Sequence, residues 1–344
     1  MKLLAIRFSA MGDVALTVPV LRAVLKANPS LEITFVSNNK FAPLFNDIPR
    51  LNFTGINLNK YIGISGLLRL AKELKNEVQW DVVLDLHSVL RTWVIMFVFK
   101  TSGLKVYSID KGRKEKKALT RKENKVRSEL KHSTIRYLDV FHEAGLHGQL
   151  EDGVFIKPKI SANASLASKA ETLALDQNLK WIGIAPFSKH SEKEWPIDNI
   201  KAVIEQLVKK KDCQVLLFGG GQEERNKLEA IARGQKNVIS IAGKLDLTLE
   251  IALIHKLELM VAMDSFNMHL AALCGVKTIS IWGATHPYAG FGPLNNNVIN
   301  ILQISTDHLP CRPCSVFGNK PCHRRDFACM NQISVAQVVD KIYS

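Results

Sequence analysis

A carboxylate stands directly after the first apolar segment of this chain, at the start of its first helix. The apolar run Leu3–Ile6 ends at Arg7, the turn Ser9–Asp13 follows, and apolar residues recur with helical spacing over Val14–Leu25. This is the strand, turn and helix that open a doubly wound α/β domain. Phosphate-binding turns of this kind contain several glycines, whereas this turn has one glycine and an acid that would repel phosphate. Asp13 therefore suits a proton acceptor, and a helix cap is the alternative.

Two further turns in the second half of the chain carry polar side chains that suit a phosphorylated ligand. The first follows a strand-like run and contains Ser188, Lys189 and Lys193, whose hydroxyl and ammonium groups are good phosphate ligands. The second, Asp264–His269, also follows an apolar run and opens a helix, whose free N–H groups could hold a diphosphate. An ordinary polar loop and a helix cap are the corresponding alternatives.

A glycine-rich strand exit, Gly219–Gly221, resembles a dinucleotide-binding turn only in part. The fingerprint requires a final glycine at the position that Glu224 occupies. An NAD-dependent dehydrogenase is therefore disfavoured. The glycines permit either close approach of the backbone to a ligand or a plain turn.

Four of the six cysteines fall in one segment near the C-terminus, as Cys311-x2-Cys314-x7-Cys322-x6-Cys329. Paired cysteines can hold structural zinc, although the second pair is spaced more widely than in a usual zinc ribbon. In a reducing compartment disulfides do not persist, so reduced structural thiols are the favoured interpretation.

The chain is strongly basic, with a net charge of +14 and a pI of about 9.5. Eleven basic residues and only three acidic ones lie between Lys111 and Arg136. This segment could bind an anionic substrate or an acidic membrane surface, or it could be a solvated loop. The aromatic residues that single-stranded nucleic acid would stack on are absent from the segment.

Composition is that of a globular protein large enough for two domains. Of 344 residues, 47% are hydrophobic and 23% are charged, so neither disulfides nor metal are needed to build a core. No secretory signal is visible, and the most apolar window, residues 93–99, is far shorter than the roughly 20 residues that cross a bilayer. We expect a cytoplasmic protein.

Strand-like and helical patterns alternate along the whole chain, which predicts parallel sheets with helices on both faces. The strands are expected at residues 3–8, 31–37, 81–86, 105–109, 181–186, 213–218, 237–241, 257–262 and 277–282. The helices are expected at 14–27, 65–78, 89–100, 198–210, 222–233, 247–255, 265–274 and 334–343.

This alternation predicts two similar domains that face each other across a cleft. We expect an N-terminal Rossmann-like domain over residues 1–160 and a second one over residues 161–330. The boundary is expected within 150–180, where Pro158 and several small polar residues weaken the strand pattern. The last helix, within residues 331–344, is expected to pack back onto the N-terminal domain.

Taken in order, these segments resemble glycosyltransferase family 9, the heptosyltransferases of lipopolysaccharide core assembly. The resemblance covers nearly the whole chain and rests on the opening turn, a basic helix, a Lys-x-Trp-Pro motif and a distinctive C-terminal block. The matching residues are 6–14, 131–139, Lys193–Pro196, Asp264–Leu273 and Trp282–Pro287.

The resemblance implies a GT-B fold, an inverting mechanism with Asp13 as general base, and no metal or other cofactor. It implies that the donor, expected to be ADP-heptose, is bound by Ser188, Lys189, Lys193, Glu223, Asp264, Ser265, Phe266, Asn267 and His269. The acceptor is expected on the basic residues Lys114, Lys116, Lys117, Arg121, His132 and Arg136.

The expected function is transfer of a heptose onto an anionic lipopolysaccharide inner-core acceptor, by an enzyme peripheral to the cytoplasmic face of the inner membrane. The chain departs from the family at Phe266, where glycine is usual, and at Asn267, where proline is frequent. The same fold acting with another nucleotide sugar on a surface glycan is therefore an alternative. A non-catalytic nucleic-acid-binding protein is a more distant one, because it leaves Asp13 and the Asp264–His269 turn unexplained.

Overall fold

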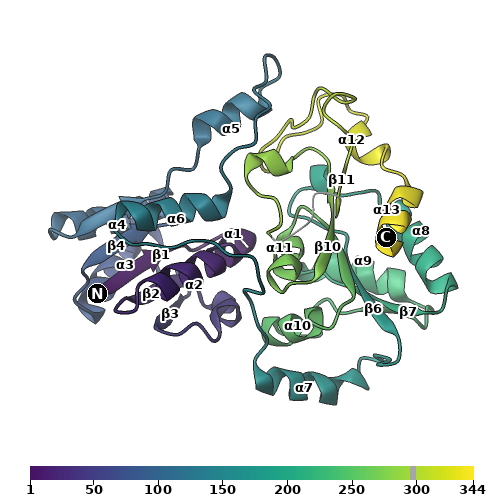
Figure 1. The fold of residues 1–344 in the computed structure, drawn as a ribbon, viewed down its shortest axis with the longest axis horizontal. Coiled ribbons are helices and arrows are strands. Elements are labelled where there is room, and N and C mark those ends of the chain that lie inside the picture. The colour runs from purple at the N-terminus through teal and green to yellow at the C-terminus, as the bar shows by residue number, and fades with distance from the viewer. Residues whose placement is uncertain (295–299) are drawn as a thin grey trace. The chain divides into compact units, whose positions relative to one another are not determined.

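The computed structural model describes residues 1–294 and 300–344, and the chain divides into two compact units (Figure 1). The first unit comprises Met1–Arg113 and Lys131–Phe155. The second comprises Lys114–Leu130 and Ile156–Ser344. Each is built on its own parallel sheet.

The first unit is a parallel sheet of order β3-β2-β1-β4-β5, with helices on both faces. Connections leave the sheet at the carboxyl ends of the strands, so the turns after β1, β4 and β5 share one edge. The elements are β1 (Lys2–Ile6), α1 (Met11–Ala15), α2 (Thr17–Ala27), β2 (Glu32–Asn38), η1 (Asn39–Phe45), β3 (Leu51–Ile56), η2 (Leu58–Lys60), α3 (Gly63–Glu77), β4 (Val82–Asp85), α4 (Leu90–Thr101), β5 (Lys105–Ser108) and α6 (Ser133–Glu143).

The second unit repeats this plan with a parallel sheet of order β11-β10-β9-β6-β7-β8. Its elements are α5 (Arg113–Thr120), α7 (Ile160–Ala170), β6 (Lys180–Ala185), η3 (Ser191–Lys193), α8 (Ile197–Lys209), β7 (Cys213–Leu217), α9 (Gly221–Ala232), β8 (Val238–Ser240), α10 (Leu247–Ile254), β9 (Leu259–Met263), α11 (Phe266–Leu273), β10 (Lys277–Trp282), η4 (Pro287–Ala289), β11 (Ile301–Gln303), α12 (Ala328–Asn331) and α13 (Val335–Tyr343).

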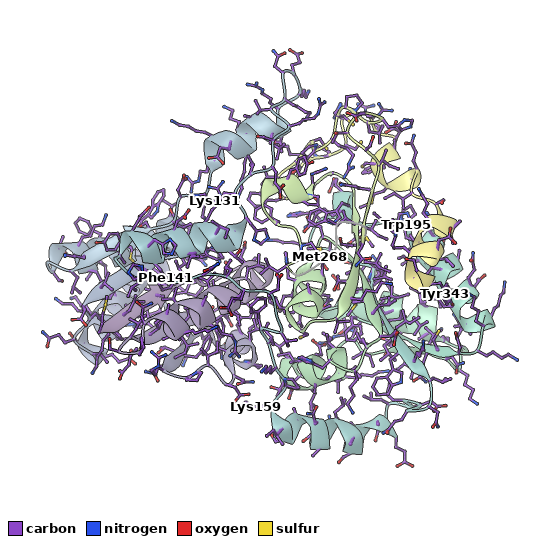
Figure 2. All side chains as sticks on the ribbon, in the orientation of Figure 1. Lys131, Phe141, Lys159, Trp195, Met268 and Tyr343 are labelled. Carbon is purple, nitrogen blue, oxygen red and sulfur yellow. The ribbon has the colours of Figure 1, made fainter. Side chains whose placement is uncertain are left out.

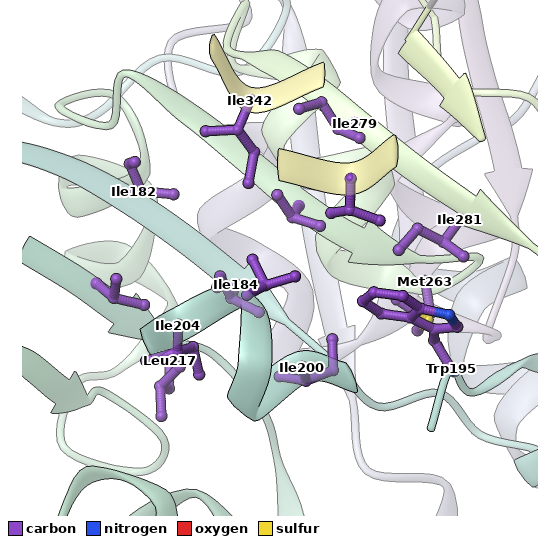
Figure 3. Close-up of a cluster of buried hydrophobic side chains, with 14 of the residues drawn as sticks. Ile182, Ile184, Trp195, Ile200, Ile204, Leu217, Met263, Ile279, Ile281 and Ile342 are labelled. Atoms are coloured by element: carbon purple, nitrogen blue, oxygen red, sulfur yellow. The ribbon is translucent and has the colours of Figure 1, made fainter. Parts of the chain in front are cut away.

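The C-terminal helix α13 packs on the second unit, so the expectation that it packs on the first was wrong. Val338 and Ile342 are buried in the same cluster as Ile204 of α8 (Figure 3). Tyr343, labelled in Figure 2, ends the helix with its ring 3.2 Å from the ammonium of Lys210. The apolar face of α13 thus packs against the neighbouring helix α8.

Residues 114–130, the centre of the basic segment, also belong to the second unit, although the sequence placed them in the first domain. The apolar side chains of Leu119 and Leu130 are buried beside Ala289. The N–H of Leu130 donates to the carbonyl of Tyr288 at 2.9 Å, and the Lys125 ammonium donates to a carbonyl of the second unit at 2.6 Å. Burial of these two leucines places residues 114–130 on the second unit, although the residues on either side belong to the first.

The segment expected to link the two domains contains a helix, and the structure has two strands that were not expected from the sequence. Residues 160–170 form α7, which packs against α10. The units divide after Phe155, inside the expected window of 150–180 and a few residues before the domain limit at 160. The strands β3 and β11 lie at the edges of their sheets and are only partly buried. Polar residues interrupt β3 at Asn52 and Thr54, and β11 has only three residues, so neither contains a continuous apolar run that the sequence pattern could reveal.

Across the described residues, no helix combines the length and the apolar character needed to cross a membrane.

Candidate functional site

Asp13 lies where the sequence placed it, in the first turn of α1 and just beyond the carboxyl end of β1. Its Oδ2 atom is 2.8 Å from the guanidinium of Arg7 and accepts a hydrogen bond from the N–H of Ala10 at 3.4 Å. The Asp13 side chain is 29% exposed, whereas that of Arg7 is 6% exposed. A buried cation therefore holds a carboxylate that solvent, and hence a substrate, can reach.

The neighbours of Arg7 keep it charged. The guanidinium donates to the carbonyl of Leu86 and lies over the ring of Tyr137, 5.2 Å from its centre. Burial alone would lower the pKa of Arg7, but Asp13 and Tyr137 more than offset this, and its pKa is raised. A permanent charge beside Asp13 favours the carboxylate form that a general base requires.

The exit of β4 supplies a second, rigid wall of this site. The carboxylate of Asp85 accepts hydrogen bonds from the N–H groups of His87 and Ser88 at 2.9 and 2.8 Å, and from the hydroxyl of Thr92 at 2.8 Å. The Nε2 atom of His87 is thereby placed 3.5 Å from the hydroxyl of Ser9. This turn is fixed by its own hydrogen bonds before any ligand binds.

His87 is a neutral group in a cationic environment. Burial lowers its pKa to about 3, and the charges of Arg7 and Lys111 lower it further in the same direction. Burial, Arg7 and Arg113 also lower the pKa of Lys111. Three residues of this site were not predicted from the sequence: Arg7, His87 and Lys111. Their common signal is position: each follows β1, β4 or β5 at the same edge of the sheet.

In the second unit, three strand exits meet at the carboxylate of Asp264. The ammonium of Lys193 lies 3.3 Å from its Oδ2 atom, and the hydroxyl of Thr285 donates to that atom at 2.8 Å. The hydroxyl of Ser188 donates to the backbone carbonyl of Asp264 at 3.1 Å. These residues follow β6, β9 and β10, so the structure brings together two of the turns that the sequence singled out.

Trp195 anchors the turn that presents Lys193. Its indole N–H donates to the carbonyl of Ile333 at 3.1 Å, and its ring is buried beside Met263 and Ile281 in the core (Figure 3). The Trp in the Lys-x-Trp-Pro motif is thus a core residue. It fixes the short η3 turn that ends at Lys193.

The other predicted donor contacts differ in accessibility. Ser265, Phe266 and Asn267 are partly exposed at the start of α11, whose N-cap is Ser265, whereas His269 is buried one turn later. Lys189 is exposed in the loop after β6. The start of α11 therefore presents its backbone beside a partly exposed phenyl ring.

The two glutamates after the glycine-rich turn have different environments. Glu223 is exposed and pairs with Lys227 at 2.7 Å, so its role as a ribose contact stays a prediction. Glu224 accepts a hydrogen bond from the N–H of Gly220 at 2.7 Å. Glu224, which stands where the dinucleotide fingerprint requires glycine, thus stabilises the glycine-rich turn.

The predicted acceptor residues are not brought together by either unit. Lys114, Lys116, Lys117 and Arg121 lie in the second unit, and His132 and Arg136 lie in the first. Lys116 is buried with its ammonium 4.4 Å from the centre of the Phe291 ring. His132 caps α6, and Arg136 donates to the carbonyl of Lys131 at 3.1 Å. Lys114, Lys117 and Arg121 are exposed.

The cysteine segment surrounds a buried arginine. Within residues 1–294 and 300–344, no group of three or more His, Cys, Asp or Glu side chains is arranged to hold a metal ion. Cys311, Cys314, Cys322 and Cys329 are free thiols. Arg312 is fully buried and donates to the carbonyls of Trp282, Gly283, Thr285 and Ile304. It fixes the loop after β10 that carries Thr285.

Comparison with known proteins agrees with this architecture. The sequence profile of glycosyltransferase family 9 (heptosyltransferase) matches residues 67–319. The chain is 26% identical over 308 residues to the lipopolysaccharide core heptosyltransferase OpsX of Haemophilus influenzae, covering 87% of this chain and 84% of that protein. It is 25% identical over 313 residues to lipopolysaccharide heptosyltransferase 3 of Escherichia coli, covering 88% of each.

Solved structures share the fold over essentially the whole chain. A family 9 glycosyl transferase from Veillonella parvula superposes with a TM-score of 0.77 at 19% identity, covering 99% of this chain and 96% of that one. The ADP-heptose lps heptosyltransferase II of Escherichia coli superposes with a TM-score of 0.71 at 16% identity, covering 100% and 98%. The GT-B fold of two Rossmann-like domains is confirmed.

Replacement of His87 by glutamine should make stability less sensitive to acid. The folded histidine, with a pKa of about 3, stays neutral, whereas the unfolded one takes up a proton below about pH 6.5. Its neutral burial therefore costs stability progressively as the pH falls from 6.5 toward 3, by at most about 1.4 kcal/mol per pH unit. Denaturation of both proteins at several pH values should give a shallower slope for the variant; equal slopes would contradict the burial of a neutral ring.

Proposed function

The chain belongs to glycosyltransferase family 9, the heptosyltransferases, and on that premise we propose that it transfers a heptose from ADP-heptose to an anionic acceptor of the lipopolysaccharide inner core. Two relatives are named as lipopolysaccharide heptosyltransferases, one of them for the lipopolysaccharide core, and one solved relative is named for ADP-heptose. The observation that carries the catalytic part is the accessible carboxylate of Asp13 held by a buried arginine.

In this proposal Asp13 is the general base of an inverting transfer. It takes the proton of the acceptor hydroxyl while that oxygen forms a bond to the anomeric carbon. The bond from that carbon to the diphosphate breaks on the opposite side, and its electron pair leaves with the nucleoside diphosphate. Attack opposite the leaving group inverts the configuration. Arg7 keeps the base charged and in place.

The leaving diphosphate requires charge relief, which the second unit offers. Lys193 carries three N–H donors, so its ammonium can bind phosphate while it stays near Asp264. The hydrogen bond from Thr285 keeps the Asp264 carboxylate in place when this happens. The N–H groups that begin α11, with Ser265 and Asn267, supply further donors. Ser188 and Lys189 flank this position.

The acceptor is anionic, and the exposed cations Lys114, Lys117 and Arg121 remain its proposed partners. Lys116, His132 and Arg136 have structural contacts as described above, so we propose that they shape the backbone around the acceptor. The enzyme is proposed to work at the cytoplasmic face of the inner membrane, where such a lipid-linked acceptor is presented.

Transfer assays with a series of nucleotide sugars test the function directly. We expect ADP-heptose to give the highest kcat/KM with a lipopolysaccharide inner-core acceptor. The phenyl ring of Phe266, partly exposed at the start of α11, is the feature that favours a different donor. Faster turnover of another nucleotide sugar would replace the heptose assignment and leave the fold and family untouched.

Asp13→Asn should lower kcat by about 10²–10⁴-fold, because an amide cannot accept the hydroxyl proton. Nucleoside diphosphate binding, measured by calorimetry, should stay within a factor of about two to three, since the donor contacts lie on the second unit. Asp139→Asn, a partly exposed acid on α6 of the same unit that likewise pairs with a cation, Lys131, is the matched control. Transfer by Asp13→Asn at the rate of the unaltered enzyme would exclude Asp13 as the base.

Lys193→Ala should weaken ADP binding by about 10–100-fold, the effect of losing one or two hydrogen bonds to a charged group. Lys209→Ala, on the exposed end of α8, removes the same charge from the same unit and should leave the affinity unchanged. Titration calorimetry on both variants gives the comparison. Equal affinities for the two would show that Lys193 only neutralises Asp264.

A further inference from the structure

Helix α4 is apolar on two opposite sides, and only one of them is covered. Ile95, Met96 and Phe99 point into the core of the first unit. The outward row consists of Leu90, Trp93 and Phe97, with exposed fractions of 74%, 47% and 66%. Their spacing of three and four residues places them on one face of the helix. A helix that is apolar all round is normally buried all round.

The start of the neighbouring helix enlarges this apolar face. Helix α3 packs alongside α4, and Ile62 and Ile64 at its beginning are 80% and 68% exposed. Because α3 leads into β4 and α4 leaves it, both helices begin at the carboxyl edge of the sheet. We call Ile62, Ile64, Leu90, Trp93 and Phe97 the α3–α4 apolar face. Several large apolar side chains exposed on two neighbouring helices mark a protein or membrane contact.

Charge around the α3–α4 apolar face favours an anionic partner. Residues 57–72 and 88–101 contain five basic side chains and no acidic one: Lys60, Arg69, Lys72, Arg91 and Lys100. The nearest acid along α3, Glu73, lies 3.7 Å from Arg69. Arg113, whose guanidinium donates to the carbonyl of Ser88 at 3.3 Å, adds a cation beside the start of α4.

We propose that the α3–α4 apolar face docks on an anionic lipid bilayer, with its aromatic and aliphatic side chains inserted at the interface and its cations on the lipid phosphates. Tryptophan and phenylalanine beside lysine and arginine are the composition of helices that lie in a membrane interface. A second copy of this chain would place these cations against each other, which disfavours a self-interface.

The position of this face gives it a role that rests on the proposed function. His87, in the wall of the Asp13 site, is three residues before Leu90 on the same strand exit. A bilayer on the α3–α4 apolar face therefore lies at the sheet edge that carries Asp13. A lipid-linked acceptor would meet the base without leaving its membrane.

Fluorescence can report this contact at one residue. All five tryptophans lie in the described residues, and Trp93 is exposed whereas Trp80, Trp181, Trp195 and Trp282 are buried. Vesicles of phosphatidylglycerol mixed with phosphatidylcholine should shift the emission of the full-length protein to the blue. Trp93→Phe should abolish the shift while the protein still sediments with the vesicles.

Replacement of Leu90, Trp93 and Phe97 together by serine should weaken sedimentation with these vesicles by about tenfold or more. Ile160→Ser, at an exposed position of α7 in the other unit, should not. Binding should also fall in high salt and on pure phosphatidylcholine. Equal binding by the triple variant, or no binding by the unaltered protein, overturns the proposal, as does a dimer in ultracentrifugation that the triple variant loses.

Activity separates this proposal from the proposed function. Transfer to a water-soluble, delipidated acceptor should proceed at the unaltered rate in the triple variant, because its substitutions lie outside the Asp13 and Lys193 sites. Vesicle binding without any heptosyl transfer by the unaltered protein would refute the proposed function alone. Transfer with unaltered vesicle binding by the triple variant would refute the docking face alone.

Discussion

The burial of Arg7 is the constraint on which the first unit is organised. A guanidinium taken out of water at the end of a central strand requires an anion and fixed acceptors, and Asp13, the carbonyl of Leu86 and the ring of Tyr137 supply them. Removing one partner of such a pair typically costs about 3–5 kcal/mol, because the other charge is left uncompensated. The pair therefore sets the position of the one carboxylate at this edge that is proposed to react.

In the second unit the buried group at the site is a carboxylate instead of a cation, and the proposed task is to stabilise a departing negative charge instead of accepting a proton. Its buried carboxylate, Asp264, gathers Lys193 and Thr285 from other strand exits, and a buried cation, Arg312, holds the loop that carries Thr285. A carboxylate that accepts a proton needs a cation to hold it on one side and must be accessible to the substrate on the other. A group that relieves a departing negative charge needs several donors fixed in advance. Both units obtain these by placing polar residues just after buried parallel strands.

The sequence predicted the architecture well because its central strands are continuous apolar runs separated by helical patterns. Asp13, Lys193 and Asp264 could be named because each follows such a run. The strands β3 and β11 and the partners of Arg312 could not, since polar residues interrupt β3, β11 is only three residues long, and a buried arginine has no distinctive local pattern. The sequence also did not predict that the basic segment is divided between the two units. The burial of Leu119 and Leu130 decides where residues 114–130 pack, whereas the charged side chains of the segment do not.

In the proposed mechanism, Asp13 is held by Arg7 and takes the proton of the acceptor hydroxyl. A crystal structure with an unreactive fluorinated ADP-heptose and an inner-core acceptor tests it most directly. We expect the acceptor oxygen to lie within hydrogen-bond reach of the Asp13 carboxylate, about 2.6–3.2 Å, with the donor diphosphate on Lys193 and the start of α11. An acceptor oxygen that faces a different side chain, with Asp13 contacting Arg7 alone, would contradict it.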